Sequence, residues 1–227
     1  MPVTSIRDLS QLFGDARDQG ARPTCLAFAA SDHHAALRDG WTPLSCEFAF
    51  YHAQRRGGRG PGVGAALCDM LTAIREDGQP PEAVWPYTPA PITDLNAWGP
   101  PAGPAPLYRR DGERRNDTFE LILALIDGGQ PALILMMLSD AFYQPNADGV
   151  VSPAVGDPPD PKRRHAVVAV AHGLLGEERA VLVRNSWGTD WGLAGHAWLT
   201  ESFLVPRLTR IAVLTEEVDV PARRAAA

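Results

Sequence analysis

The order of the apolar patterns along this chain constrains its fold more than any other feature of the sequence. Three segments with a helical pattern come first, at residues 25–39, 46–56 and 65–77. One further helical pattern and five runs of strand length follow, at residues 117–129, 130–138, 165–173, 179–187, 195–204 and 209–217. Helices first and strands afterwards predict an α+β protein with two unlike lobes.

Turn-forming residues separate these patterns. Ser45 is a good N-cap for the second helix, and a glycine-rich loop over residues 57–64 follows that helix. Residues 80–106 hold many prolines and little periodicity, which is typical of a connecting segment. We expect a single domain over residues 1–227. Its parts are a helical lobe at about 20–100, a β lobe at about 105–215 and a tail at 219–227.

Composition and charge restrict the partners and the location. The 227 residues are 45% hydrophobic and 21% charged, which is ordinary for a globular protein. The net charge of −6, with no long basic run, argues against nucleic acid. No apolar run reaches the roughly 18 residues that span a bilayer, and the amino terminus has no signal-peptide pattern. We expect no membrane partner and a cytoplasmic location, with export by a route that needs no signal peptide left open.

The three cysteines do not predict a disulfide framework. Cys25, Cys46 and Cys68 are an odd number and form no CxxC pair, so we also expect no metal site and no cofactor. We interpret Cys46 and Cys68 as reduced packing residues. Cys25 differs, because it stands where a turn-forming stretch becomes an apolar helix. The positive end of the helix dipole favours a thiolate there, and a nearby imidazolium would favour it further.

Spacing alone does not select the histidine partner of Cys25. His33 and His34 lie roughly 12 to 13 Å along the helix from Cys25, which is too far for contact. His52 would need an unusual helix crossing. His165 and His172 are an odd number of residues apart on one predicted strand, so we expect them on opposite faces, with at most one of them in a cleft.

The next strand ends in "RNSWGTDWG", which adds two groups to the predicted site. Asn185 is placed to orient an imidazole on the neighbouring strand. Trp187 is placed to shield that hydrogen bond from water. An amide oxygen that accepts from a ring N–H fixes the tautomer of the ring without adding charge.

The stretches "DQGARPTCLAFA", "HAVVAVAHG" and "RNSWGTDWG" resemble the three active-site motifs of papain-like cysteine peptidases. Weaker matches extend the resemblance over nearly the whole chain and keep the order of the motifs. The resemblance implies a papain-like two-lobe fold, in which a helical lobe faces an antiparallel β-barrel-like lobe across the active-site cleft. With only 18 residues before Gln19, we expect a bacterial-type branch without the inhibitory propeptide of secreted relatives.

The resemblance also implies a role for each residue of the site. Cys25 would be the nucleophile, His165 the general base and later the general acid, and Asn185 the group that orients the imidazole. Gln19 would donate its side-chain amide to the oxyanion, together with the backbone N–H of Cys25. Gly62 and Gly64 would let a substrate backbone approach closely, with a flexible loop as the alternative interpretation.

Three departures from the family pattern bear on the site. Arg22 stands where the family has a structural cysteine, so that disulfide is absent, and Leu26 replaces a tryptophan. The basic residues Lys162, Arg163 and Arg164 precede His165, where many relatives carry an acidic or amide residue. Two hypotheses for this basic stretch stay open, a solvated loop or a group that attracts an acidic part of the substrate.

These features predict a cysteine peptidase that hydrolyses peptide bonds through a Cys-His-Asn thioester mechanism. The alternatives are another thiol acyl-transfer enzyme on the same scaffold (amidase, transpeptidase or isopeptidase) and a catalytically silent binding module. The expected partner is a peptide or protein substrate. Narrow specificity, a regulatory or inhibitor partner, or delivery to another compartment would limit activity, and the oligomeric state stays open.

Overall fold

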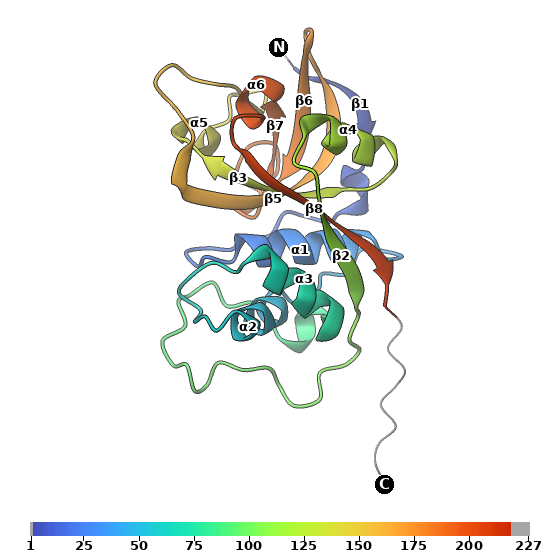
Figure 1. Cartoon of the computed structure of the whole chain (residues 1–227), viewed down its shortest axis with the longest axis vertical. Helices are drawn as coiled ribbons and strands as arrows, with labels where there is room; N and C mark the ends of the chain where they lie inside the picture. The colour runs from blue at the N-terminus through green and yellow to red at the C-terminus, as the bar shows by residue number, and fades with distance from the viewer. Residues whose placement is uncertain (1, 219–227) are drawn as a thin grey trace.

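A computed structural model describes residues 2–218 and shows a helical lobe packed against a lobe built on one sheet (Figure 1). The helical lobe holds α1 (Cys25–Ala36), α2 (Cys46–Arg56) and α3 (Leu67–Glu76). Three further helices belong to the sheet lobe, α4 (Phe119–Asp127), α5 (Asp140–Tyr143) and α6 (Glu201–Leu204), and two short 3-10 helices are η1 (Ser10–Leu12) and η2 (Glu82–Val84). The predicted α+β class with two unlike lobes is confirmed, whereas the predicted tail at 219–227 lies outside the described residues.

The sheet has eight strands in the order β2-β8-β3-β5-β6-β7-β4, with β1 paired to β5 outside this path. The strands are β1 (Thr4–Asp8), β2 (Arg110–Arg115), β3 (Ala132–Leu138), β4 (Val150–Val151), β5 (Asp160–Leu175), β6 (Glu178–Arg184), β7 (His196–Thr200) and β8 (Leu208–Glu217). All pairs are antiparallel except β4 with β7, which is parallel and departs from the expected antiparallel lobe. The carboxyl end of β8 and strand β2 extend down beside α3 in Figure 1.

Strand β5 is the centre of the sheet and separates two hydrophobic cores. Ala166 and Val168 enter the core that the sheet shares with α1, α2 and α3. Their neighbours Val167 and Ala169 enter the core under α4, α5 and α6. This alternation is the period of two expected for a strand buried on both faces. Because α1 packs directly on this strand, the start of α1 and the start of the predicted histidine strand lie at the same interface.

A β-bulge in β5 overturns the expected placement of the two strand histidines. The register against β6 shifts between Ala169 and Ala171, so that one extra residue interrupts the alternation. His172 therefore returns to the face of His165, and the prediction of opposite faces is wrong. The two rings are still far apart, since seven residues of strand span roughly 23 Å. His172 Nε2 bonds instead to Asp127 Oδ1 of α4, at 2.7 Å.

Other elements show which sequence signals were too weak. The strand predicted over 195–204 ends at Thr200, whose hydroxyl caps the short helix α6 by accepting from the backbone N–H of Phe203 at 3.3 Å. Strands β1 and β2 have no apolar alternation, with the sequences TSIRD and RDGERR, so neither was predicted. Ser45 does cap α2 as predicted, because its Oγ accepts from the backbone N–H of Phe48 at 3.1 Å.

The three cysteines are unbonded, but only one of the two expected packing cysteines is buried. Cys46 is fully buried at the start of α2. Cys68 is exposed, so its interpretation as a packing residue is wrong. The reason is helical spacing, since α3 buries Met70, Ala73 and Ile74 and Cys68 lies off that face. Residues 2–218 contain no helix long and apolar enough to cross a bilayer and no cluster of three metal-ligating side chains.

We predict that His33→Leu stabilises the protein and weakens its acid denaturation. His33 is fully buried in α1, and neither ring nitrogen has a hydrogen-bond partner among the described residues. Burial, followed by the nearby charges of His34 and Arg110, lowers the pKa of His33 from 6.5 to about 3. As the pH falls below 6.5, His33 binds a proton in the unfolded state but stays neutral in the folded state. The free energy of unfolding therefore decreases until about pH 3.

Urea unfolding at pH 7 and pH 5 measures both effects. We expect His33→Leu to gain about 1 kcal/mol at pH 7, because an unsatisfied polar ring is removed, and to lose less than the wild type at pH 5. His34→Leu is the matched control, since it breaks the 2.8 Å hydrogen bond from His34 Nδ1 to Gln79 Oε1. An unchanged pH dependence in His33→Leu would contradict the prediction.

Candidate active site

Cys25 lies at the first residue of α1 and lines a cavity between the two lobes. The cavity has a volume of about 230 Å³, with Cys25 and Gly64 on the helical side and His165 and Ala166 on the sheet side. Cys25 is half-buried, so its thiol is reachable from the cavity. The fold therefore brings the predicted nucleophile and the predicted base to one space, from opposite lobes.

His165 is oriented by Asn185 through a hydrogen bond whose direction is determined by a third group. His165 Nε2 lies 2.7 Å from Asn185 Oδ1, and the backbone N–H of Ser186 donates to the same oxygen at 2.8 Å. Because a backbone N–H only donates, this atom is the amide oxygen, and His165 Nε2 must carry the proton. The other ring nitrogen, Nδ1, is left as the basic one.

Burial shifts the pKa values of Cys25 and His165 in the directions that favour the neutral form of each group. It raises the pKa of the Cys25 thiol, which hydrogen bonds from the backbone at Ala166 and Leu26 lower only in part. It lowers the pKa of His165 from 6.5 to about 4, against the opposing effect of the bond to Asn185. The predicted thiolate–imidazolium pair therefore depends on the mutual attraction of the two charges, and not on the surroundings of either group alone.

Gln19 is anchored to the same segment as Asn185. Its side-chain Oε1 accepts from the hydroxyl of Ser186 at 2.7 Å, and its backbone N–H donates to the carbonyl of Ser186 at 2.9 Å. Its Nε2 donates one hydrogen to the carbonyl of Arg22 at 2.9 Å. An amide NH₂ group carries two hydrogens, so the second remains for another acceptor.

Aromatic rings surround His165, among them Trp187, which was predicted to shield the His165–Asn185 bond. The Trp187 ring lies 4.8 Å from the His165 ring. Phe142 contacts both rings edge-on, and Tyr143 stacks on Trp187 at 5.2 Å. Phe142 and Tyr143 were not predicted, since the four-residue helix α5 that carries them is too short to show a period. Apolar rings at these positions would limit the access of water to the bond that orients the base.

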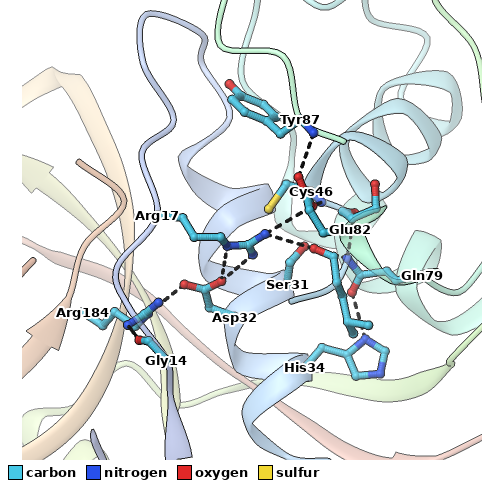
Figure 2. Close-up of polar contacts among 12 residues, drawn as sticks. Gly14, Arg17, Ser31, Asp32, His34, Cys46, Gln79, Glu82, Tyr87 and Arg184 are labelled. Atoms are coloured by element: carbon cyan, nitrogen blue, oxygen red, sulfur yellow. Dashed lines mark hydrogen bonds and ion pairs between the residues drawn. The ribbon is translucent and has the colours of Figure 1, made fainter. Parts of the chain in front are cut away.

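A buried carboxylate on α1 connects both halves of the site, and Figure 2 shows its partners. Asp32 Oδ2 accepts from Arg184 Nε at 2.7 Å, and Asp32 Oδ1 accepts from Arg17 Nε at 2.9 Å and also from Arg17 Nη2. Arg184 directly precedes Asn185, and Arg17 lies two residues before Gln19. Asp32 thus holds the segments of two predicted site residues against the helix that begins with Cys25. No motif identified Asp32.

Arg22, which stands where papain-like peptidases have a structural cysteine, forms a buried ion pair. Arg22 and Glu47 are each 2% exposed, and their two hydrogen bonds measure 2.5 and 2.8 Å. The indole Nε1 of Trp98 donates to the same carboxylate at 2.7 Å. The loop before Cys25 is therefore tied to α2 by charge.

The two predicted substrate-binding glycines are not equivalent. Gly64 lines the cavity beside Cys25, and a side chain added there would meet the carbonyl of Pro23 at 3.8 Å. Gly62 is exposed, does not line the cavity, and has no neighbour within 4 Å of an added Cβ. The structure brings only Gly64 together with Cys25 and His165.

We predict that Asp32→Asn destabilises the protein by about 3 kcal/mol, because it leaves the buried Arg184 and the half-buried Arg17 without a full counter-charge. Asp69→Asn is the matched control. It removes one carboxylate from a half-buried ion pair, in which the side chain of Arg59 is 31% exposed and that of Asp69 is 23% exposed. The corresponding values for Arg184 and Asp32 are 1% and 4%. Such a pair contributes less than about 1 kcal/mol. Urea unfolding at pH 7 measures both variants, and equal losses would contradict the prediction.

Known proteins resemble this chain in sequence and in fold. The sequence profile described as papain family cysteine protease matches residues 109–204, a segment that holds His165 and Asn185. A probable cysteine protease of Arabidopsis thaliana, RD21C, is 30% identical over 140 residues. These residues are 60% of this chain but only 29% of the relative, so the chain spans less than a third of the relative's length.

Solved structures match nearly the whole chain. Xylellain, a cysteine protease from Xylella fastidiosa, has a TM-score of 0.75 at 21% identity and is matched over 93% of this chain and 86% of its own. The cysteine protease and lectin-like domains of Cwp84 from Clostridium difficile give a TM-score of 0.71 at 16% identity, over 98% and 55% of the two chains. At such identities these likenesses establish the fold.

Proposed function

We propose that this chain is a papain-like cysteine peptidase that hydrolyses peptide bonds through a thioester on Cys25, because it resembles that family in its fold and in the sequence of residues 109–204. One observation carries this function. Cys25 and His165 line one cavity from opposite lobes, and the 2.7 Å bond to Asn185 leaves His165 Nδ1 as the basic nitrogen of the ring. Peptides or proteins are the corresponding substrates.

Acylation begins when Cys25 Sγ attacks the carbonyl carbon of the substrate. His165 Nδ1 takes the thiol proton, and the carbonyl oxygen becomes an oxyanion. The backbone N–H of Cys25 and the second side-chain N–H of Gln19 donate to that oxyanion. His165 then returns the proton to the leaving amine, which departs as the C–N bond breaks and the thioester forms.

Deacylation uses the same groups with water in place of the amine. His165 Nδ1 removes a proton from water, whose oxygen attacks the thioester carbon. The C–S bond breaks, the proton returns to the sulfur, and the free carboxylic acid leaves. Throughout, Asn185 stabilises the imidazolium orientation, and the aromatic cover of Trp187 maintains the bond between these residues.

We predict that Cys25 is alkylated by iodoacetamide at neutral pH faster than the exposed Cys68, and that His165→Ala reverses this order. Without the imidazole, burial alone acts on Cys25 and raises the pKa of its thiol, so Cys25 should then react only at higher pH. Peptide mass mapping over pH 5 to 10 separates the two thiols within one sample. If Cys25 reacts more slowly than Cys68 in the wild type, the nucleophile is unassembled.

Hydrolysis itself is tested by incubating a diverse peptide mixture with the wild type and with Cys25→Ala. We expect cleavage only by the wild type. In H₂¹⁸O, each new carboxylate should carry one heavy oxygen, which distinguishes hydrolysis from transfer to another amine. Peptides that end in a new amide would contradict the proposed reaction.

We predict that Gln19→Ala lowers kcat by about 10²-fold, the usual cost of one oxyanion donor. Ser186→Ala is the control for the anchor, because it removes the 2.7 Å bond to Gln19 Oε1 and keeps the amide donor. Its kcat should fall less than that of Gln19→Ala. Steady-state kinetics on one cleaved peptide measures both variants, and an unchanged kcat in Gln19→Ala would remove this residue from the oxyanion site.

A further inference from the structure

We propose that the cavity beside Cys25 selects substrates with an acidic side chain, through the guanidinium groups of Arg164 and Arg210. This inference rests on the proposed peptidase activity and names its substrate class. Both arginines line the cavity together with Cys25 and His165. Both are exposed, which puts their charged ends at the mouth of the cavity, where a substrate enters.

The strand pairing explains why two arginines distant in the sequence meet here. Leu135 of β3 pairs with Ala166 of β5 on one side and with Arg210 of β8 on the other. Met137, two residues further along β3, pairs with Arg164. Positions two apart on a strand share a face, so both arginines stand on the sheet face that looks towards α1.

The charges around the cavity are not balanced. No aspartate or glutamate among the described residues lines it. Arg210 has one carboxylate partner, Asp117, at 3.4 Å, but Asp117 is shared with Arg114 at the same distance. Within residues 2–218, the only side-chain hydrogen bond of Arg164 goes from Nε to the carbonyl of Pro161, at 3.2 Å, and no carboxylate pairs with its guanidinium group. The mouth therefore carries excess positive charge.

The structure also distinguishes Arg164 from the two basic residues before it. Arg163 is paired with Asp140 at 2.6 Å and with Asp160 at 3.0 Å, so its charge is already balanced. Lys162 is exposed, and neither residue lines the cavity. The structure places all three basic residues in strand β5, so the predicted loop is wrong. Attraction of an acidic group is left to Arg164.

The wall of the cavity suits a side chain with an apolar stem and a charged end. Leu26 and Ala166 are buried, Leu135 is partly buried, and these three apolar residues line the cavity together with the two arginines. The methylene groups of a glutamate would pack on these apolar residues, while its carboxylate would reach the mouth. Charge-assisted hydrogen bonds to a guanidinium then favour glutamate over its neutral isostere, glutamine, and disfavour lysine.

The test compares pairs of peptide vinyl sulfones, which label the thiol of Cys25 and need no hydrolysis. In each pair one position carries glutamate or glutamine, and the rate of Cys25 labelling is followed by mass spectrometry. At one position we expect glutamate to label the wild type about five- to tenfold faster. In Arg164→Gln this ratio should fall to about twofold or less, and in Arg164→Glu it should drop below one.

Lys162→Gln is the matched control. It also removes one positive charge, but from a side chain that lies two residues before Arg164 and does not line the cavity. Its ratio should equal that of the wild type. In 1 M NaCl the wild-type ratio should fall towards one, since the interaction is electrostatic and exposed to solvent. A preference due to shape would not change with salt.

The outcomes separate this inference from the proposed function. A glutamate ratio near one at every position, an equal loss in Lys162→Gln, or no labelling by any peptide would overturn the acidic selection. If neutral peptides are cleaved while the labelling ratio of glutamate to glutamine is near one, the proposed peptidase activity stands and only the acidic selection is overturned. Preferential labelling by glutamate peptides without any hydrolysis would keep the selection and overturn the peptidase.

Discussion

The bidentate contact of one buried carboxylate, Asp32, with two arginines is the interaction on which the site depends. Both oxygens of Asp32 are used, one by Arg184 from the sheet and one by Arg17 from the amino-terminal segment. Since Arg184 is also bonded to the carbonyls of Gly14 and Asp15, at 2.6 and 2.5 Å, the contact joins helix α1, strand β6 and the amino-terminal segment. A buried charge of this kind is costly to leave unpaired, so each partner constrains the others. That constraint acts on the relative position of Cys25, Asn185 and Gln19 together with the two hydrogen bonds between Gln19 and Ser186.

The same burial that makes the site rigid opposes its chemistry. Removing Cys25 and His165 from water disfavours the charged form of each, and the shifts in their pKa values have opposite signs for that reason. Reactivity then requires that proton transfer between them be compensated by attraction within the cavity, where little water screens it. The aromatic cover around His165 strengthens this attraction and also keeps the Asn185 bond dry. An open site would solvate both ions but would not hold the imidazole in one orientation.

Much of the candidate site could be predicted from the sequence, and each failure has a physical cause. The helix start at Cys25 and the asparagine at the end of the next strand are local patterns, so neighbouring residues were enough to predict both. The parity argument for His165 and His172 failed because a bulge depends on the pairing of β5 with β6, which no single strand reveals. Cys68 was predicted to be buried, whereas the helical spacing of Met70, Ala73 and Ile74 leaves it off the buried face of α3. Strands β1 and β2 are extended because they pair with β5 and β8, and their own residues show no alternation of apolar and polar side chains.

The sequence by itself determined the order of helices and strands, the caps and turns between them, and the motif residues, because these depend on neighbours within a few positions. The tertiary structure alone decided which distant groups meet. Asp32 and Arg184 are 152 residues apart, so no local pattern could pair them. In the same way, two adjacent arginines have an identical local chemistry, yet Arg163 is balanced by Asp140 and Arg164 lines the cavity. The physical reason is that ion pairs and cavities are properties of packed surfaces, and a surface exists only once the chain has folded.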